Sequence, residues 1–141
     1  VTTHPSGTLA TAMILVKEIM AKGKEIPLIS YNKNIRTAIT IMSKKSLGIV
    51  CVKEKNGKIN LITDGDIRRN SNNLYKRKIL EVCNKNPTWI SDTTSAISAI
   101  GKMSSLGITS LLVTRNQDIK KKIKKIIGVL HLHHCLHRGI R

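Results

Sequence analysis

Residues 58–69 of this 141-residue chain read Lys58-Ile59-Asn60-Leu61-Ile62-Thr63-Asp64-Gly65-Asp66-Ile67-Arg68-Arg69. The first half is apolar and β-branched, which is typical of a strand. Thr63 or Asp64 can then cap a helix, and an acidic residue such as Asp66 is favourable in the first helical turn, where the helix dipole is positive. This stretch therefore predicts a strand that leads directly into a helix.

The residues before this stretch predict a hairpin and an earlier helix. Asn56-Gly57 is a strong signal for a tight turn, so the apolar run 47–52 is expected to pair with the strand that ends at Thr63. Further upstream, apolar residues recur at i, i+3, i+4 and i+7 and form one face of a helix. They are Ile35, Ala38, Ile39 and Met42. An extended piece at 27–29 precedes that helix, which gives the order strand, helix, strand, strand, helix.

The second half of the chain repeats this order with few identical residues. The apolar helical face recurs as Ala96, Ala99, Ile100 and Met103. An extended piece at 88–90 precedes it, and the strand-like runs 108–113 and 126–130 follow it. A longer connection, 115–125, replaces the tight turn, and the last run leads into a helix start at His131. Self-similarity of this kind is the mark of a repeat architecture.

These repeats predict an α/β (α+β) fold of two βαββα units. The first covers residues 16–72 and the second 73–141, after a leader of residues 1–15, and the polar stretch 70–78 joins the two. One repeat has too few apolar residues to bury both faces of its sheet, so we expect the two to pack sheet to sheet about a pseudo-twofold axis. Clefts between two such halves suit a ligand.

The composition limits the classes of partner. The formal net charge is +17, which raises the expectation of an anionic partner, but the lysines are spread along the chain and aromatic residues are only 2% of it, with no Phe. A base-stacking surface is therefore missing, and we expect no nucleic acid as primary partner. No run approaches the about 20 apolar residues of a membrane span, and the start has no signal-peptide pattern, so no membrane and a cytoplasmic location are expected. The cysteines are three, widely spaced, and predicted to be reduced thiols.

Three separated motifs carry a family resemblance. They are Thr63-Asp64-Gly65-Asp66-Ile67-Arg68-Arg69, Gly128-Val129-Leu130-His131-Leu132-His133 and His4-Pro5-Ser6-Gly7-Thr8-Leu9. Together they resemble a tandem CBS (cystathionine-β-synthase type) pair, and specifically the C-terminal part of arabinose 5-phosphate isomerases. The resemblance implies a parent enzyme in which an N-terminal SIS domain interconverts ribulose 5-phosphate and arabinose 5-phosphate for Kdo and lipopolysaccharide synthesis. It places one proposed catalytic histidine at His4, which is an incomplete site, so the chain alone is not expected to catalyse.

The same resemblance supplies candidate ligand residues. In CBS pairs the aspartate matching Asp66 receives ribose hydroxyls, while the threonine matching Thr63 faces phosphate or sugar, with Asp64 beside them. In the second repeat the corresponding set is Thr109, Ser110, His131 and His134. Histidines replace the threonine and the aspartate there, which puts the second cleft in doubt. No resident cofactor is expected, and the implied effector is an adenine nucleotide or a nucleotide sugar.

Each signal has a plainer interpretation. Asp64 and Asp66 could simply cap a helix, because capping selects the same residue types. The run 131–137 contains several histidines, but without an acidic or cysteine partner at matching spacing we predict no metal site. The lysine-rich insertion 118–125 is expected to be a solvated loop, with an anion-binding patch as the alternative. Trp89 is expected in a core or dimer contact.

Two functions from different classes remain open. The first is a regulatory ligand-binding module that acts on a SIS isomerase domain and forms a homodimer. The second is a structural dimerisation module whose clefts stay empty, and the histidine at position 134 is its best argument. A weaker third is a general anion or nucleic-acid binder, which would show steep salt dependence.

Overall fold

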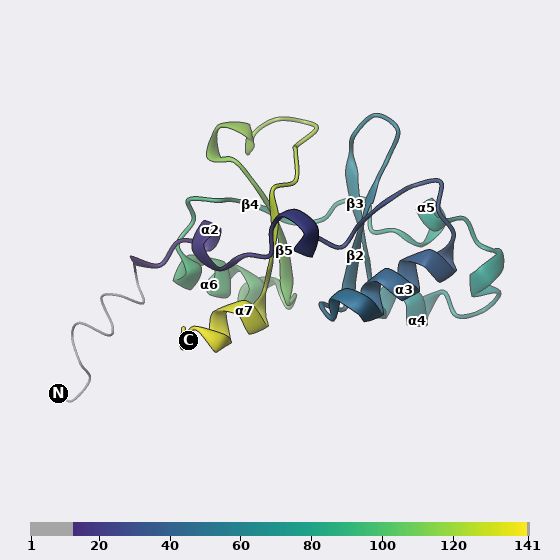
Figure 1. The fold of residues 1–141 in the computed structure, drawn as a ribbon, viewed down its shortest axis with the longest axis horizontal. Helices are drawn as coiled ribbons and strands as arrows, with labels where there is room; N and C mark the ends of the chain where they lie inside the picture. The colour runs from purple at the N-terminus through teal and green to yellow at the C-terminus, as the bar shows by residue number, and fades with distance from the viewer. Residues whose placement is uncertain (1–12, 141) are drawn as a thin grey trace. The chain divides into compact units, whose positions relative to one another are not determined.

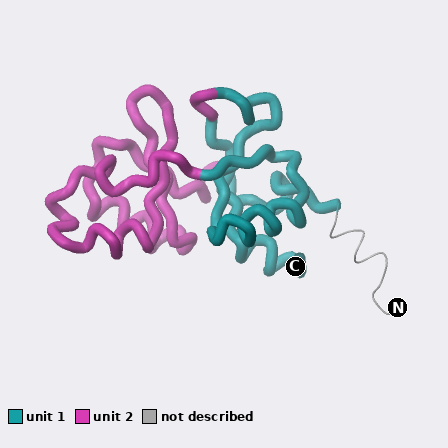
Figure 2. The backbone as a smooth tube through the Cα atoms, turned by 180° about the vertical axis from the view of Figure 1, so that it is seen from behind, with its two compact units in different colours: residues 1–22, 88–121, 125–141 teal, residues 23–87, 122–124 magenta. Residues whose placement is uncertain are grey.

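The computed structural model describes residues 13–140 (Figure 1). It contains two three-stranded sheets, and the chain divides into two compact units, coloured separately in Figure 2. We call residues 23–87 with 122–124 the N-sheet unit. The C-sheet unit is made of residues 88–121, the chain from 125 onward and the segment that precedes residue 23. The mixed α+β class and the order strand, helix, strand, strand, helix are confirmed in both.

The N-sheet unit contains β1 (Leu28–Ser30), β2 (Ile49–Lys53) and β3 (Ile59–Thr63). β1 pairs with β2 in parallel and β2 with β3 antiparallel, with Ile49 opposite Thr63 at one end and Lys53 opposite Ile59 at the other. β2 starts two residues later than predicted because Gly48 has a left-handed φ of +68° and interrupts the extended backbone.

The predicted tight turn is the loop that joins β2 to β3 (Figure 1), and the strand register puts Thr63 at the opposite end of this hairpin. Gly57 adopts φ +93°, which favours glycine, and the Lys58 amide donates to the Asn56 side chain at 2.9 Å. The Glu54 amide closes the turn by donating to the Lys58 carbonyl at 2.8 Å. The turn thereby fixes the register that brings Thr63 to the helix start.

α3 (Ile35–Lys45) covers one face of this sheet. Asn34 caps it by accepting from the Thr37 amide at 2.9 Å, and the buried face of Ile35, Ala38 and Met42 is the one predicted from their spacing. The helix ends at Ser46, whose φ is +59°. These side chains form a core with Val50, Val52 and Ile62 of the strands.

The stretch after α4 (Asp64–Arg69) also belongs to this core. η2 (Leu74–Lys76) and α5 (Ile79–Val82) follow, and Leu74, Ile79 and Val82 are buried in the same cluster as α3. The apolar residues at 74 and 79 anchor what the sequence presents as a polar joining stretch. Residues 70–78 are therefore part of the N-sheet unit as well as a connection.

The C-sheet unit repeats the arrangement. β4 (Trp89–Ser91) pairs in parallel with β5 (Ser110–Thr114), which pairs antiparallel with β6 (Gly128–His131). α6 (Ala96–Leu106) is capped by Ser95, which accepts from the Ser98 amide at 3.1 Å, and ends at Gly107 with φ +67°. The connection 115–125 between β5 and β6 contains η3 (Asn116–Asp118). The last helix of the unit is α7 (Leu132–His137).

The segment from Met13 to Lys22, which we call the N-terminal strap, packs with the C-sheet unit. It contains α2 (Val16–Ile19), and Val16 is fully buried in the core with Leu111 and Leu130. Ala21 forms a two-way bridge to Val129, each amide donating to the other carbonyl at 2.9 Å. η1 (Gly23–Glu25) then leads into β1. The chain thus contributes to the C-sheet unit before and after it builds the N-sheet unit.

All three cysteines are free thiols in the structure. Burial raises the pKa of Cys51 to about 12 and also raises the pKa of Cys135. Burial raises the pKa of Cys83 to about 12, with added repulsion from the charges of Asp66 and Glu54. Thiols held protonated are poor nucleophiles, which is consistent with the predicted reduced state. Among residues 13–140, no helix is long and apolar enough to span a membrane.

Candidate functional site

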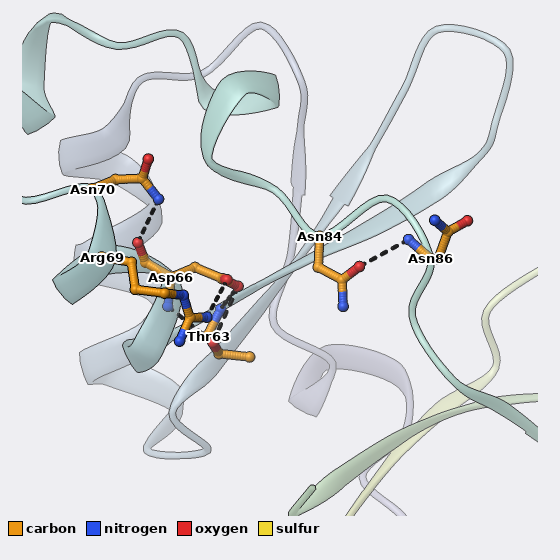
Figure 3. Close-up of polar contacts among 6 residues, drawn as sticks. All are labelled: Thr63, Asp66, Arg69, Asn70, Asn84 and Asn86. Atoms are coloured by element: carbon orange, nitrogen blue, oxygen red, sulfur yellow. Dashed lines mark hydrogen bonds and ion pairs between the residues drawn. The ribbon is translucent and has the colours of Figure 1, made fainter. Parts of the chain in front are cut away.

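The first predicted helix start forms a reciprocal capping box (Figure 3). The Asp66 amide donates to Thr63 Oγ1 at 3.1 Å, while Asp66 Oδ2 accepts from the Thr63 amide at 2.9 Å and from the Thr63 hydroxyl at 3.0 Å. The strand end and the first helical turn are locked together by two side chains, which is the arrangement expected for this box.

The second oxygen of Asp66 has a different partner. Asp66 Oδ1 accepts from Arg69 Nη2 at 2.7 Å, one helical turn away, and the Asn70 side chain donates to the Asp66 carbonyl at 2.7 Å. The side chain of Arg69 is 69% exposed and that of Asp66 13%. Ion pairs with one exposed partner are weak and exchange readily with solvent or ligand. Asp66 Oδ2 therefore holds the helix start together, while Oδ1 pairs with an exposed cation.

Asp64 lies apart from this network. Its amide donates to the Gly48 carbonyl at 3.1 Å, and its exposed carboxylate lies over Gly48, where an added Cβ would stand 3.0 Å from Oδ2. The structure brings Thr63 and Asp66 together as predicted and leaves Asp64 outside the box. Helix capping alone accounts for the contacts of Thr63 and Asp66. A ligand contact at Asp66 would use the same side-chain position, so the geometry does not separate the two interpretations.

The outer edge of β3 beside this site is covered by the chain itself. The Leu61 amide donates to the Asn84 carbonyl at 3.0 Å, and the Asn84 amide donates back at 2.7 Å. The Asn84 side chain in turn accepts from the Asn86 amide at 2.9 Å (Figure 3). Residues 84–86 therefore protect the strand that carries Thr63.

The second helix start has a similar box built from imidazoles, in which the capping side chain accepts from the amide two residues later and not three. The His131 amide donates to His134 Nδ1 at 3.0 Å, and the His133 amide donates to His131 Nδ1 at 3.0 Å. An imidazole nitrogen that accepts cannot carry a proton, so both rings are neutral with the hydrogen on Nε2. Burial, reinforced by the neighbouring histidines, lowers the pKa of His131 to about 4 and also lowers that of His134.

Thr109 and Ser110, the other two candidates of the second repeat, lie beside this box. The Leu132 amide donates to the Thr109 carbonyl at 2.8 Å, and Ser110 is paired with His131 across the strands, so their side chains share a face. The buried Ser110 hydroxyl has no hydrogen-bond partner among the described residues. At the equivalent position of the N-sheet unit, opposite Thr63, stands the apolar Ile49.

Two further histidines lie on α7 within the described residues, His133 and His137. The rings of His133 and His137 stack with centroids 6.4 Å apart. Across residues 13–140, no three His, Cys, Asp or Glu side chains are grouped to hold a metal ion. His4, the family's catalytic position, lies outside the described residues.

These observations define a tandem module: one βαββα unit occurs twice, and in each the third strand runs into a helix start closed by a reciprocal side-chain box. The CBS domain family model matches residues 16–73 and 79–140. The chain belongs to the CBS-domain family.

Relatives in sequence sharpen this assignment. The chain is 40% identical to the arabinose 5-phosphate isomerase KdsD of Francisella tularensis subsp. tularensis, over 98% of this chain and 42% of the relative. It is 30% identical to the KdsD of Escherichia coli (strain K12), over 97% of this chain and 41% of that protein. The chain thus spans about two fifths of the length of the curated relatives it matches.

Solved structures agree on the fold. A conserved protein from Pyrococcus horikoshii superposes with a TM-score of 0.74 at 19% identity, over 92% of this chain and 95% of that one. CBSX2, solved in complex with AMP, gives a TM-score of 0.74 at 16% identity, over 89% of this chain and 96% of that one. The CBS domain pair of protein MJ0100 was solved in complex with 5′-methylthioadenosine and S-adenosyl-L-methionine. It gives a TM-score of 0.73 at 21% identity, over 89% of this chain and 94% of that one. At these identities the likeness concerns the fold alone.

Proposed function

We propose that this chain is the regulatory, ligand-binding CBS pair of an arabinose 5-phosphate isomerase. The observation that carries the proposal is the 40% identity to one such enzyme over 98% of the chain, while only 42% of that enzyme is matched. The catalytic chemistry of the parent then belongs to a SIS domain outside the matched region. Aldose–ketose isomerisation needs acid and base groups around a bound sugar, and His4 alone does not supply them.

The proposed ligand is an adenine nucleotide or a nucleotide sugar. Solved proteins of this fold include one in complex with AMP and one in complex with S-adenosyl-L-methionine, which supports an adenosine-bearing ligand here. In this chain the proposed contact is Asp66. A ribose hydroxyl would donate to Asp66 Oδ1 in place of Arg69, whose exposed ion pair costs little to exchange. Oδ2 keeps its bonds to Thr63, so binding leaves the helix start intact.

The second helix start would act differently in this proposal. Its neutral imidazoles use Nδ1 for the backbone and present only Nε2–H donors, so they cannot accept from ribose as a carboxylate does. The unpartnered Ser110 hydroxyl adds another donor beside them. A ligand at this position would therefore be bound through acceptor groups such as phosphate oxygens.

Regulation of the SIS domain requires two arrangements of the module with different affinity for the ligand. A ligand that binds both arrangements equally well would not change the SIS domain, however tightly it binds. We expect the module to associate as a homodimer, as the resemblance implies. A structural dimerisation module without ligand is the competing function, and the observation in its favour is that both carboxylate oxygens of Asp66 already have partners within the fold.

The test is calorimetric titration of the 141-residue chain with AMP, ADP, ATP and CMP-Kdo at moderate salt, with two matched variants. Asp66→Asn and Asp64→Asn remove the same charge, but only the first alters the box. We expect selective binding of one nucleotide that Asp66→Asn weakens about tenfold or more, the cost of a charge-assisted hydrogen bond, and that Asp64→Asn leaves within about twofold. Thermal unfolding of both variants shows that they fold.

The chain could bind none of the four nucleotides, or bind them unselectively and lose them with added salt. Either result would contradict the regulatory function and favour the structural dimerisation module. Equal loss in both variants would show that net charge, and not the box, attracts the ligand.

A further inference from the structure

The N-sheet unit contains a hollow that the Thr63–Asp66 box does not use. It has a volume of about 530 Å³ and is lined by two short segments, 31–34 and 77–80. The first segment directly follows β1, whose last residue, Ser30, pairs with Lys53, and Lys53 pairs with Ile59. Thr63 pairs with Ile49 at the other end of the same strands. The hollow and the capped helix start therefore lie at opposite ends of the sheet.

The charged groups of this hollow are all cationic. Lys33, Arg77 and Lys78 line it, and no lining residue is acidic. In the described part of the chain none of the three side chains has an ion-pair partner, and Arg77 Nε donates only to the Asn72 carbonyl at 3.3 Å. One carboxylate lies at the rim, where Glu81 accepts from the Lys78 amide at 2.6 Å. Three cationic residues therefore line the hollow, and no acidic residue lines it.

The floor of the hollow is apolar and belongs to the core. Ile79 is buried, and Tyr31 and Leu80 are half-buried against the same cluster that holds α3. Their positions are fixed by the packing of the unit, so the hollow is formed before a ligand arrives. An apolar floor with a few cations at its wall suits a molecule that has a carbon framework and an anionic group.

We propose that this hollow binds a small organic phosphate, at a site independent of the nucleotide site proposed above. Arg77 matches the geometry of phosphate oxygens through its planar guanidinium, and Lys33 and Lys78 add point charges. The carbon framework rests on Tyr31, Ile79 and Leu80. The volume lies within the range of about 300–1,000 Å³ that small-molecule sites occupy.

A neighbouring hollow provides the control. It has about 370 Å³, shares Tyr31, and is lined by Lys53 and Lys55, but Glu54 stands between these lysines. Glu54 also accepts from the buried Asn60 side chain at 2.6 Å. Lys55→Gln therefore removes one exposed positive charge close to the proposed site without altering its lining.

The experiment follows the backbone amide resonances of the ¹⁵N-labelled 141-residue chain at 150 mM salt during titration with phenyl phosphate. Inorganic phosphate and phenol are titrated separately. We expect saturable shifts of residues 31–34 and 77–80, with no saturable shift at 63–66. Phenyl phosphate should bind more tightly than inorganic phosphate or phenol. Lys33→Gln and Arg77→Gln should each weaken binding about tenfold, as expected for loss of a charge-assisted hydrogen bond, and Lys55→Gln less than twofold.

Several outcomes would overturn the proposal. They are shifts that never saturate, shifts over every basic surface, equal effects of Lys33→Gln and Lys55→Gln, and phenol binding as well as phenyl phosphate. Lys33 is exposed, so its substitution tests the site even if Arg77→Gln perturbs the fold. Nucleotide binding at Asp66 is read from residues 63–66, so either proposal can fail without the other.

Discussion

The two helix starts share a backbone geometry and differ in chemistry. In the N-sheet unit Thr63 and Asp66 close the box with a hydroxyl and a carboxylate, and in the C-sheet unit His131 and His134 close it with two ring nitrogens. A carboxylate oxygen has lone pairs to spare after it caps a helix, whereas an imidazole that caps has none. The same box therefore leaves a spare acceptor in one unit and only donors in the other.

The largest expected difference between the two helix starts is in the stability that they contribute at acidic pH. His131 has a folded-state pKa of about 4 against 6.5 when unfolded, so its contribution to stability is complete above pH 6.5 and is lost as the pH falls toward 4, when the unfolded chain binds the proton first. The lowered pKa of His134 acts in the same direction. For His131 alone the full loss is about 3 kcal/mol, and His134 adds to it. It should be measured by urea unfolding between pH 7 and pH 4.

The matched variant carries His131→Thr with His134→Asp, which copies the first box into the second unit. The wild-type minus variant difference in unfolding free energy should become more negative as the pH falls through this window, because only the wild type carries the two imidazoles. Parallel curves for the two proteins would mean that the imidazole box does not control acid stability.

A smaller effect is expected from breaking the first box. Thr63→Ala removes the hydroxyl that accepts from the Asp66 amide and should cost about 1–2 kcal/mol of unfolding free energy at neutral pH. Thr40→Ala is the control, because Thr40 lies on exposed α3 surface and donates only to the Arg36 carbonyl four residues earlier. Its loss should change stability by less than about 0.5 kcal/mol. Equal costs for the two substitutions would show that the Thr63–Asp66 box stabilises the fold no more than a surface hydrogen bond does.

The smallest effect concerns the exposed ion pair. Arg69→Gln frees Asp66 Oδ1 and should change the unfolding free energy by less than about 0.5 kcal/mol, because Arg69 is largely exposed. Arg68→Gln, with the same change of charge on the same helix, should match it. A cost above about 1 kcal/mol for Arg69→Gln alone would show that Asp66 cannot release this oxygen to a ligand.

Local patterns in the sequence predicted much of the fold. The spacing of Ile35, Ala38 and Met42 identified α3, and Asn56-Gly57 located the hairpin turn, because periodicity and turn chemistry depend on neighbouring residues. The box at Thr63 and Asp66 was predictable for the same reason, since its partners are three residues apart.

Features that depend on distant contacts were missed. The strap is tied to Val129 from the other end of the chain, and the hollow beneath Tyr31 needs residues 77–80 of another segment. The tautomer of His131 follows from which amide reaches its Nδ1, a detail of geometry that residue type does not carry. Leu74 and Ile79 were the available signal that residues 70–78 join a core.

The N-terminal strap has a consequence for synthesis on the ribosome. Val16 and Ala21 are made before the N-sheet unit, but their partners on β6 and in the C-sheet core are made after it. The N-sheet unit is almost contiguous, so it can form while the chain is still growing. Until β6 emerges, the strap lacks its partner strand and is able to dock on the same surface of a second copy, and exchange between nascent chains is the characteristic error of such an order.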